Sequence, residues 1–405
     1  MPKLPVRSAH HAGDAQLASW TGLLCLAALC AVLAGCASQP PAGARSTAAL
    51  LHDEYFPEAA APVAADDVFA LSPAMRQYAD AELGHGNPSH DPRRALIEAL
   101  YGHGQLRLEY DAGATRNAAQ AFEARAGNCL SLVIMSAAFA KYLDLPVSFQ
   151  SVAVDELYTR SGGLTLASGH VNLVLGRVPG RRIIAQSVPE ELVVDFLPGA
   201  ELRGMRGLPL QEATVTAMYM NNRAAENLAA GRLDESYRWA RAAVLQDPGL
   251  HNALNTLAVV YLRSGHPGAA EAALQQVLLR EPENVSALSN LAGLLAHAGR
   301  AAEAQAVQAR LARVQPIPPF RDFDLGRRAM DEGDFRQARE LFARELRRQP
   351  YQPEVHFWAA LADYRLGDND RAARHLREAV DNSTTPGAQA LYAAKLERLR
   401  ALRSQ

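Results

Sequence analysis

A thiol, an imidazole and a carboxylate follow one another in the middle of the 405-residue chain, at Cys129, His170 and Asp195. Groups of these three types can form a relay in which the histidine takes the thiol proton and the carboxylate fixes the tautomer and orientation of the ring. The activated sulfur can then attack the carbonyl carbon of an amide or an ester. The chain therefore carries a candidate catalytic set, if its secondary structure brings the three side chains together.

The cysteine is expected at the start of a helix. Gly127 and Asn128 form the turn that leads into an apolar run reaching about residue 142. Backbone N–H groups without a partner in the first helical turn, together with the helix dipole, favour a thiolate at this position. The alternative is that Cys129 is a small buried apolar side chain, as free cysteines often are.

The same helix start could hold a developing oxyanion through the backbone N–H of Cys129. Gln120 and Asn128 are candidates for a second donor, and the alternatives are an amide on a helix face and an ordinary turn residue. A zinc site built from the cysteine, the histidine and the aspartate is a less favoured use of the same side chains. We expect neither a metal nor a cofactor.

The histidine and the aspartate fall in strand-like segments. His170 opens "HVNLVLG", in which alternation places the three aliphatic side chains on one face and the histidine on the other. Asp195 lies in "ELVVDF", an apolar segment where a buried carboxylate is costly unless it has a partner such as a histidine. The two residues are therefore expected to share a site.

The elements that must position this site occupy about residues 71–210. Three helices are predicted first, in "SPAMRQYADAEL", "DPRRALIEALYG" and "TRNAAQAFEARAG", and the helix that begins near Cys129 follows them. Strand-like segments come next, in "VSFQSVAV", "HVNLVLG", "RRIIAQSV" and "LVVDF", with "RVPG" as a hairpin turn between the middle two. Helices before a small antiparallel sheet predict an α+β domain. The glycine-rich residues 155–169 are either a substrate-gating loop or a surface excursion.

Three of these segments carry a resemblance to a known family. "AFEARAGNCLSLVIMSAAFAKYLDLP", "SGHVNLVL" and "LVVDF" together resemble the bacterial transglutaminase-like superfamily, which is related to papain-type cysteine peptidases. The resemblance covers about residues 71–210. It implies an α+β fold in which the cysteine starts a helix packed on a small sheet, and it implies catalytic roles for Cys129, His170 and Asp195. Family members with tetratricopeptide repeats behind this domain match the layout of the whole chain.

The rest of the chain is predicted to be helical and repetitive. Glycine recurs every 34 residues, at Gly231, Gly265, Gly299, Gly333 and Gly367. Proline keeps the same period, and small residues recur where two helices of a hairpin must pack closely. The pattern resembles five tetratricopeptide repeats, at residues 217–250, 251–284, 285–318, 319–352 and 353–386. Residues 387–405 are expected to form a capping helix, which completes an all-α solenoid after the α+β domain.

The first helix of each repeat should line a concave groove. Four asparagines are expected on or near that face, namely Asn221, Asn222, Asn255 and Asn290. Their amides could hold an extended peptide backbone by hydrogen bonds, or they could be polar residues of a solvated surface. The expected partner is a protein or a peptide. A net charge of −2 gives no argument for nucleic acid.

The N-terminus has the layout of a bacterial export signal. Lys3 and Arg7 precede the apolar run "WTGLLCLAALCAVLAGC", which is too short to span a bilayer comfortably. Its end resembles the lipobox of bacterial lipoproteins, which implies lipidation of Cys36 after removal of residues 1–35. Ala37 follows, where inner-membrane retention requires aspartate, so we expect an outer-membrane lipoprotein that faces the periplasm. The alternative is an ordinary cleaved signal or a membrane anchor.

Two further features follow from this processing. Residues 36–70 are rich in alanine and proline and are expected to tether the folded part, with "LLHDEYF" as an apolar patch that docks on it. Cys129 would be left as the single free thiol, because Cys25 and Cys30 leave with the signal and Cys36 is blocked by lipid.

Two functions are compatible with these features. The first is a membrane-anchored, thiol-dependent acyl-transfer enzyme whose repeats recruit a protein substrate or partner. Water as the acceptor would make it a peptidase or amidase, and an amine would make it a cross-linking transferase. The alternative is a non-catalytic lipoprotein scaffold that binds envelope proteins through its repeats.

Overall fold

The computed structural model describes the following residues: 47–56, 63, 65, 67–83, 91–101, 108–110, 114–161, 164–177, 189–196, 207–317, 320–350, 352–383 and 386–403. The predicted signal peptide, Cys36, most of the tether and the strand predicted at "RRIIAQSV" lie outside them. The chain divides into the units Met1–Arg45 and Ser46–Gln405, and all the described residues belong to the second. Among these residues, no helix has both the length and the apolar character needed to cross a bilayer.

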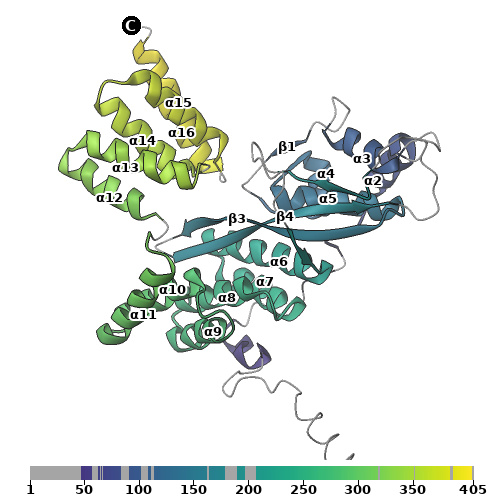
Figure 1. Cartoon of the computed structure of the whole chain (residues 1–405), viewed down its shortest axis with the longest axis horizontal. Helices are drawn as coiled ribbons and strands as arrows, with labels where there is room; N and C mark the ends of the chain where they lie inside the picture. Colours follow the sequence, from purple (N-terminus) through teal and green to yellow (C-terminus); the bar gives the residue numbers. More distant parts are fainter. Residues whose placement is uncertain are drawn as a thin grey trace, which may run out of the picture. The chain divides into compact units, whose positions relative to one another are not determined.

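Helices form the first part of the described chain, and local signals set where they begin (Figure 1). Their bounds are Pro73–Tyr78 (α2), Pro92–Tyr101 (α3), Ala118–Ala124 (α4) and Cys129–Tyr142 (α5). A π-helical turn, η3 (Ala79–Leu83), continues α2. Ser72 caps α2 by accepting the N–H of Met75 at 3.2 Å, and a proline occupies the first turn. The helices predicted in this region are confirmed.

Helix α5 is the centre of the first domain. Every residue from 130 to 140 is buried, so this helix is apolar on all sides rather than on a single stripe. A four-stranded antiparallel sheet packs on it in the order β5-β4-β3-β6. The strands are Val147–Ser161 (β3), Leu164–Gly176 (β4), Glu191–Val194 (β5) and Gly207–Leu210 (β6), and a short parallel pair joins Glu109–Tyr110 (β1) to Ala126–Gly127 (β2).

The sheet corrects one expectation. Residues 155–161 and 164–169, expected to be part of a gating loop or a surface excursion, are strand, because β3 and β4 pair as one long hairpin out to Ser161 and Leu164. Segments such as "ELYTRS" and "LTLAS" contain the aromatic and β-branched residues that favour strands. The register shifts between Val152 and Leu157, so the hairpin contains a bulge or a similar irregularity.

Eleven helices follow the sheet, as five hairpins and a final helix (Figure 1). They are Glu212–Ala229 (α6), Leu233–Gln246 (α7), His251–Arg263 (α8), Pro267–Arg280 (α9), Val285–His297 (α10), Ala301–Val314 (α11), Arg321–Glu332 (α12), Phe335–Arg348 (α13), Pro353–Arg365 (α14), Asn369–Asp381 (α15) and Pro386–Arg403 (α16). The five glycines of the 34-residue period lie in the hairpin turns with φ between 75° and 84°, a conformation that side chains other than glycine rarely adopt. The predicted hairpins and final helix are confirmed.

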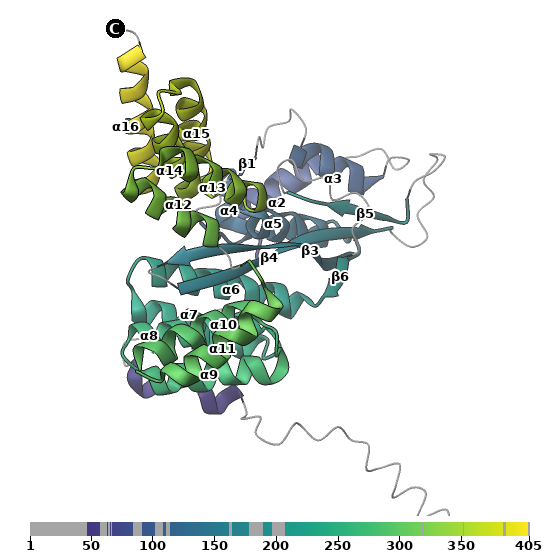
Figure 2. The same ribbon diagram turned by 60° about the vertical axis from the view of Figure 1, so that its left-hand side comes forward.

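The first repeats and the sheet share one hydrophobic core. Helix α6 contacts β3, and α8 and α10 contact β4. Figures 1 and 2 show these repeat helices on the side of the hairpin opposite α5. The six β4 residues 170–175 are all buried, as a strand covered on both faces requires. The buried cluster runs from Leu50 to Ala304, whereas the fourth and fifth repeats have clusters of their own.

Residues 47–56, the N-terminal strap, dock on the first two repeats as expected for "LLHDEYF". Leu50 is 1 % exposed and Phe56 is 4 % exposed. The hydroxyl of Tyr261 donates to the carbonyl of Leu50 at 2.7 Å and accepts the N–H of His52 at 3.1 Å. The hydroxyl of Tyr237 donates to Asp53 at 2.7 Å. The strap therefore holds the start of the folded part against α7 and α8.

Replacing Tyr261 by phenylalanine is expected to loosen the strap. The substitution keeps the ring but leaves the carbonyl of Leu50 and the N–H of His52 without this partner, which should cost about 1–3 kcal/mol of unfolding free energy. Urea unfolding would measure the change. Tyr364→Phe is the matched control, because Tyr364 is 45 % exposed. Equal midpoints for the two variants would contradict the bridging role of the Tyr261 hydroxyl.

Candidate functional site

Cys129 is the first residue of α5, and the turn before it is built for that position. The side chain of Asn128 caps the helix by accepting the N–H of Ser131 at 2.9 Å and its hydroxyl at 2.7 Å. A Cβ at Gly127 would lie 2.6 Å from the Cβ of Ser131, so only glycine fits there without a shift. The thiol itself is free and partly exposed. The residue also packs against the hydrophobic core of the domain.

The two candidates for a second oxyanion donor both have capping roles. Besides capping α5, Asn128 donates its amide to the hydroxyl of Thr115 at 2.8 Å. Gln120 forms a capping box with Asn117 at the start of α4, and its side-chain oxygen accepts the Asn117 N–H at 3.2 Å. These contacts account for both residues as helix caps. Their roles in stabilising an oxyanion stay predictions.

His170 and Asp195 meet across two neighbouring strands. His170 Nε2 lies 2.8 Å from Asp195 Oδ1. The pairing of Leu173 with Val194 places Asp195 just beyond the end of β5, on the strand face that His170 shares. His170 is 3 % exposed, whereas the Asp195 side chain is 24 % exposed. The histidine is thus buried and the carboxylate reaches it from the edge of the site.

The thiol lies beside this pair. Burial opposes a charge on the imidazole, but the hydrogen bond to Asp195 and the neighbouring Cys129 thiol outweigh burial and raise the pKa of His170 to about 9. Because Nε2 is taken by Asp195, Nδ1 is the ring nitrogen left for the sulfur. Nδ1 is buried and makes no hydrogen bond within the described residues. The structure therefore pairs His170 with Asp195, and the catalytic role of Cys129 with this pair stays a prediction.

The raised pKa predicts how stability depends on pH. A group that binds its proton more tightly in the folded state contributes stability that is fully present below its ordinary pKa of 6.5 and is lost as pH rises through about 9. We expect the difference in unfolding free energy between the wild type and His170→Gln to shrink by about 3 kcal/mol from pH 6 to pH 10. Urea unfolding at several pH values would measure it. A constant difference over this range would show that His170 has no raised pKa.

The four groove asparagines occupy a covered surface. Asn221, Asn255 and Asn290 are 8 %, 2 % and 3 % exposed, and Asn222 is partly buried. The amide of Asn290 donates to the side chain of Asn255 at 3.0 Å, which links α10 to α8. The helices that carry these residues contact β3 and β4. Three of the four side chains are therefore buried in this structure, and their role in binding a peptide stays a prediction.

Sequence reasoning missed one polar cluster close to the site. Arg93 and Asp91, both buried, form an ion pair at the start of α3, and Arg93 also donates to backbone carbonyls near the end of β4 and just before β5. The signal in the sequence is "DPRR", which by itself predicts only the start of a helix. Within the described residues, no group of three or more His, Cys, Asp or Glu side chains is arranged to hold a metal ion.

Comparisons with known proteins match the repeats. Residues 255–316 and 323–385 match the tetratricopeptide repeat family. Similar solved structures include PilF of Pseudomonas aeruginosa, with 21 % identity over 48 % of this chain and 88 % of that one and a TM-score of 0.29. MamA of AMB-1 is 21 % identical over 41 % of this chain and 90 % of the MamA chain, with a TM-score of 0.24. YrrB is described as a TPR protein with an unusual peptide-binding site. It is 19 % identical over 44 % of this chain and 92 % of the YrrB chain, with a TM-score of 0.24. No curated protein matches the chain. By the family match and the 34-residue hairpins, the C-terminal part of this chain is built from tetratricopeptide repeats.

Proposed function

We propose that the protein is a scaffold that binds a protein partner through its repeats. The match of two long segments to the tetratricopeptide repeat family carries this proposal, because stacked helical hairpins present an extended surface suited to protein ligands. In the proposed setting, a lipid on Cys36 anchors the chain at the outer membrane, facing the periplasm, and the partner is an envelope protein. The lipobox-like ending of the N-terminal apolar run supports this setting.

The fourth and fifth repeats are the proposed binding region. The first three repeats face β3 and β4 through α6, α8 and α10. In the later repeats, Arg327 of α12 lies over the ring of Trp358 of α14, with 4.7 Å between its guanidinium carbon and the ring centroid. These are the first helices of their hairpins, the ones expected to line a groove. Tryptophan and arginine are the residue types that dominate binding energy at protein interfaces.

A paired comparison tests this region. The full chain and a Trp358→Ala variant, attached to beads, would be exposed to periplasmic extract, and the bound proteins would be quantified by mass spectrometry. We expect at least one protein to be depleted about tenfold or more by the substitution. Tyr364→Ala is the control, because Tyr364 is an exposed aromatic residue on another face of the same helix. Equal recovery of all proteins on all three baits would contradict the proposal.

A second candidate function is thiol-dependent acyl transfer at Cys129. The hydrogen bond between His170 and Asp195, with the thiol beside the ring, favours it. In this reaction the thiol proton passes to His170 Nδ1 before the attack, because the pKa of about 9 keeps the ring protonated at neutral pH, and the sulfur anion then attacks the carbonyl carbon of an amide. The carbon–nitrogen bond then breaks as His170 returns that proton to the leaving amine, which leaves a thioester on Cys129. Water or a second amine resolves the thioester, and Asp195 holds the ring throughout.

The two functions differ in one labelling experiment. A form that lacks residues 1–36 has Cys129 as its single cysteine, so a peptide-like acyl-mimic probe reports on that thiol alone. For acyl transfer we expect labelling at neutral pH that is absent in Cys129→Ala and falls at least a hundredfold in His170→Ala. The scaffold function alone predicts equal labelling of the wild type and His170→Ala. Iodoacetamide, which needs no substrate-like binding, would check that the thiol stays accessible in both proteins.

A further inference from the structure

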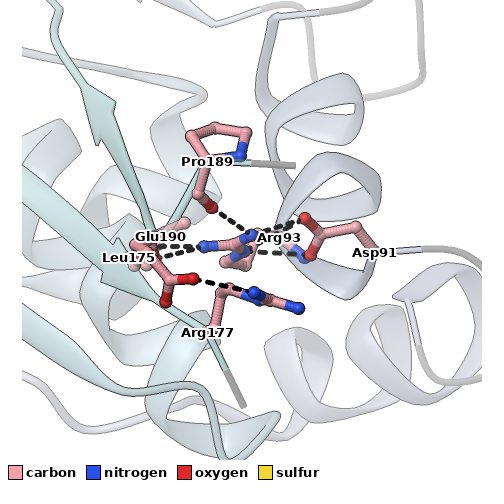
Figure 3. Close-up of polar contacts among 6 residues, drawn as sticks. All are labelled: Asp91, Arg93, Leu175, Arg177, Pro189 and Glu190. Atoms are coloured by element: carbon pink, nitrogen blue, oxygen red, sulfur yellow. Dashed lines mark hydrogen bonds and ion pairs between the residues drawn. The ribbon is translucent and has the colours of Figure 1, made fainter. Parts of the chain in front are cut away.

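Arg93 is a buried arginine of the first domain whose hydrogen-bond donors are all satisfied. It is 1 % exposed, and all five of its N–H donors have acceptors (Figure 3). Nε donates to the carboxylate of Asp91 at 3.0 and 3.1 Å, and Nη2 donates to Asp91 Oδ2 at 2.8 Å. Nη2 also donates to the carbonyl of Pro189 at 3.0 Å. Nη1 donates to the carbonyls of Glu190 at 2.9 Å and Leu175 at 3.3 Å.

These bonds join three separate segments. Asp91 and Arg93 belong to the start of α3, Leu175 is near the end of β4, and the other two carbonyls immediately precede β5. Burial opposes the charge of Asp91, but the hydrogen bonds from Arg93 outweigh it and lower the pKa of the carboxyl group. A buried ion pair of this kind is costly to form, because both charges lose their hydration. Its contribution to the protein must therefore lie in the hydrogen bonds from Arg93 to the strand backbones.

The explanation lies at the other end of β5. This strand has only four residues, and four residue pairs hold it to β4, from Gly176–Glu191 to Leu173–Val194. Asp195 follows directly. A slip of one residue in this register would turn every side chain of β5 to the opposite face and carry Asp195 away from His170. Four residue pairs at the edge of a sheet specify the register only weakly. The hydrogen bonds from Arg93, in contrast, fix the backbone of the two residues just before β5.

We propose that Arg93 is a positioning residue that fixes the register of β5 on β4, so that the carboxylate of Asp195 reaches His170. The inference rests on the second candidate function, acyl transfer at Cys129. Lysine cannot replace the arginine fully, because its three donors on a single nitrogen cannot serve a carboxylate and three carbonyls on different segments. The outer ion pair between Arg177 and Glu190, at 2.8 Å, lies beside this network on the surface.

The hydrogen bond of His170 gives a direct readout. In the full chain, NMR titration of the His170 ring should report a pKa of about 9 for the wild type. We expect Arg93→Met to lower this value by about one unit or more, because Asp195 no longer holds the ring. Arg93→Lys should give an intermediate value. Arg177→Ala is the matched control, since it breaks only the exposed ion pair with Glu190, and it should leave the titration unchanged.

A second variant separates positioning from stability. Arg93→Met alone leaves the carboxylate of Asp91 buried without its partner, which destabilises the fold. The double variant Asp91→Leu/Arg93→Met removes both charges and is expected to regain part of the unfolding midpoint. It should not regain the wild-type titration of His170, because the bonds to Pro189, Glu190 and Leu175 are still missing. A purely structural ion pair would give recovery of both quantities.

The outcomes are distinct. A folded Arg93→Met protein and a folded double variant that titrate like the wild type would overturn the proposal. If Arg93→Met does not fold, Arg93→Lys keeps a positive charge beside Asp91 but cannot make all the bonds to the three carbonyls, and an unchanged His170 titration in that variant would overturn it equally. Failure of the acyl-transfer function would be seen in the labelling experiment instead: the acyl-mimic probe would then label Cys129 equally in the wild type and in His170→Ala. The NMR comparison decides the role of Arg93 in either case.

Discussion

Asp195→Asn is expected to lower the rate at which an acyl-mimic probe labels Cys129 by about a hundredfold to ten-thousandfold. The carboxylate can only accept a hydrogen bond, so it holds a proton on His170 Nε2 and leaves Nδ1 as the nitrogen that takes and holds the thiol proton. An asparagine amide can instead donate to Nε2. That contact favours the tautomer with the proton on Nδ1, which cannot act as a base towards the sulfur.

The measurement is the second-order rate constant of labelling in the form that has Cys129 as its single cysteine. Glu191→Gln is the matched control, because Glu191 is an exposed carboxylate on β5, the strand that leads to Asp195, and its substitution should change the rate less than threefold. Labelling of Asp195→Asn at the wild-type rate would show that the 2.8 Å contact with His170 has no part in thiol activation.

Glu345→Ala is expected to cost about 3–5 kcal/mol in the stability of the fourth repeat. The Glu345 side chain is fully buried and accepts the backbone N–H groups of Phe320 and Phe323, both at 3.3 Å. It also accepts from Arg348 at 2.7 Å. Phe320 has a φ of 62°, a strained value for a residue with a side chain, so the start of α12 depends on this carboxylate.

Hydrogen exchange of the α12 and α13 amides would report the loss, together with the urea midpoint. Glu340→Ala provides the comparison, because Glu340 is an exposed carboxylate on the same helix. Its substitution should change the unfolding free energy by no more than about 0.5 kcal/mol. Glu345→Gln keeps one acceptor oxygen and should lie between the two. If Glu345→Ala exchanges no faster than Glu340→Ala, the carboxylate does not hold the helix start.

The two functions proposed for this protein place different demands on its halves. The scaffold function depends on surfaces of the fourth and fifth repeats, where Trp358 and Arg327 lie together. Acyl transfer depends on the first domain, where Cys129 is partly exposed and His170 is buried. The shared core between the sheet and the first three repeats means that substitutions in α6, α8 or α10 are expected to affect both.

Local signals in the sequence were sufficient to predict the helices. Ser72 before a proline predicts the start of α2, and the glycines of the 34-residue period predict the hairpin turns, where φ is positive. The small residues of the period have an equally local reason: a Cβ at Gly326 would lie 2.5 Å from the ring of Phe342 on the facing helix. Caps, turns and close helix contacts within a hairpin involve residues near one another in the chain, so residue type and spacing determine them.

Contacts between distant segments were decided only by the tertiary structure. The sequence by itself determined the helices, the repeat period and the three reactive side chains. It did not determine that residues 155–161 and 164–169 extend a hairpin, that the first repeats cover this hairpin, or that Asn255 and Asn290 are buried there. Nor did it show that the guanidinium of Arg93 reaches carbonyls more than eighty residues away. Periodicity shows which face of an element is apolar, but the surface that covers this face depends on the packing of the whole chain.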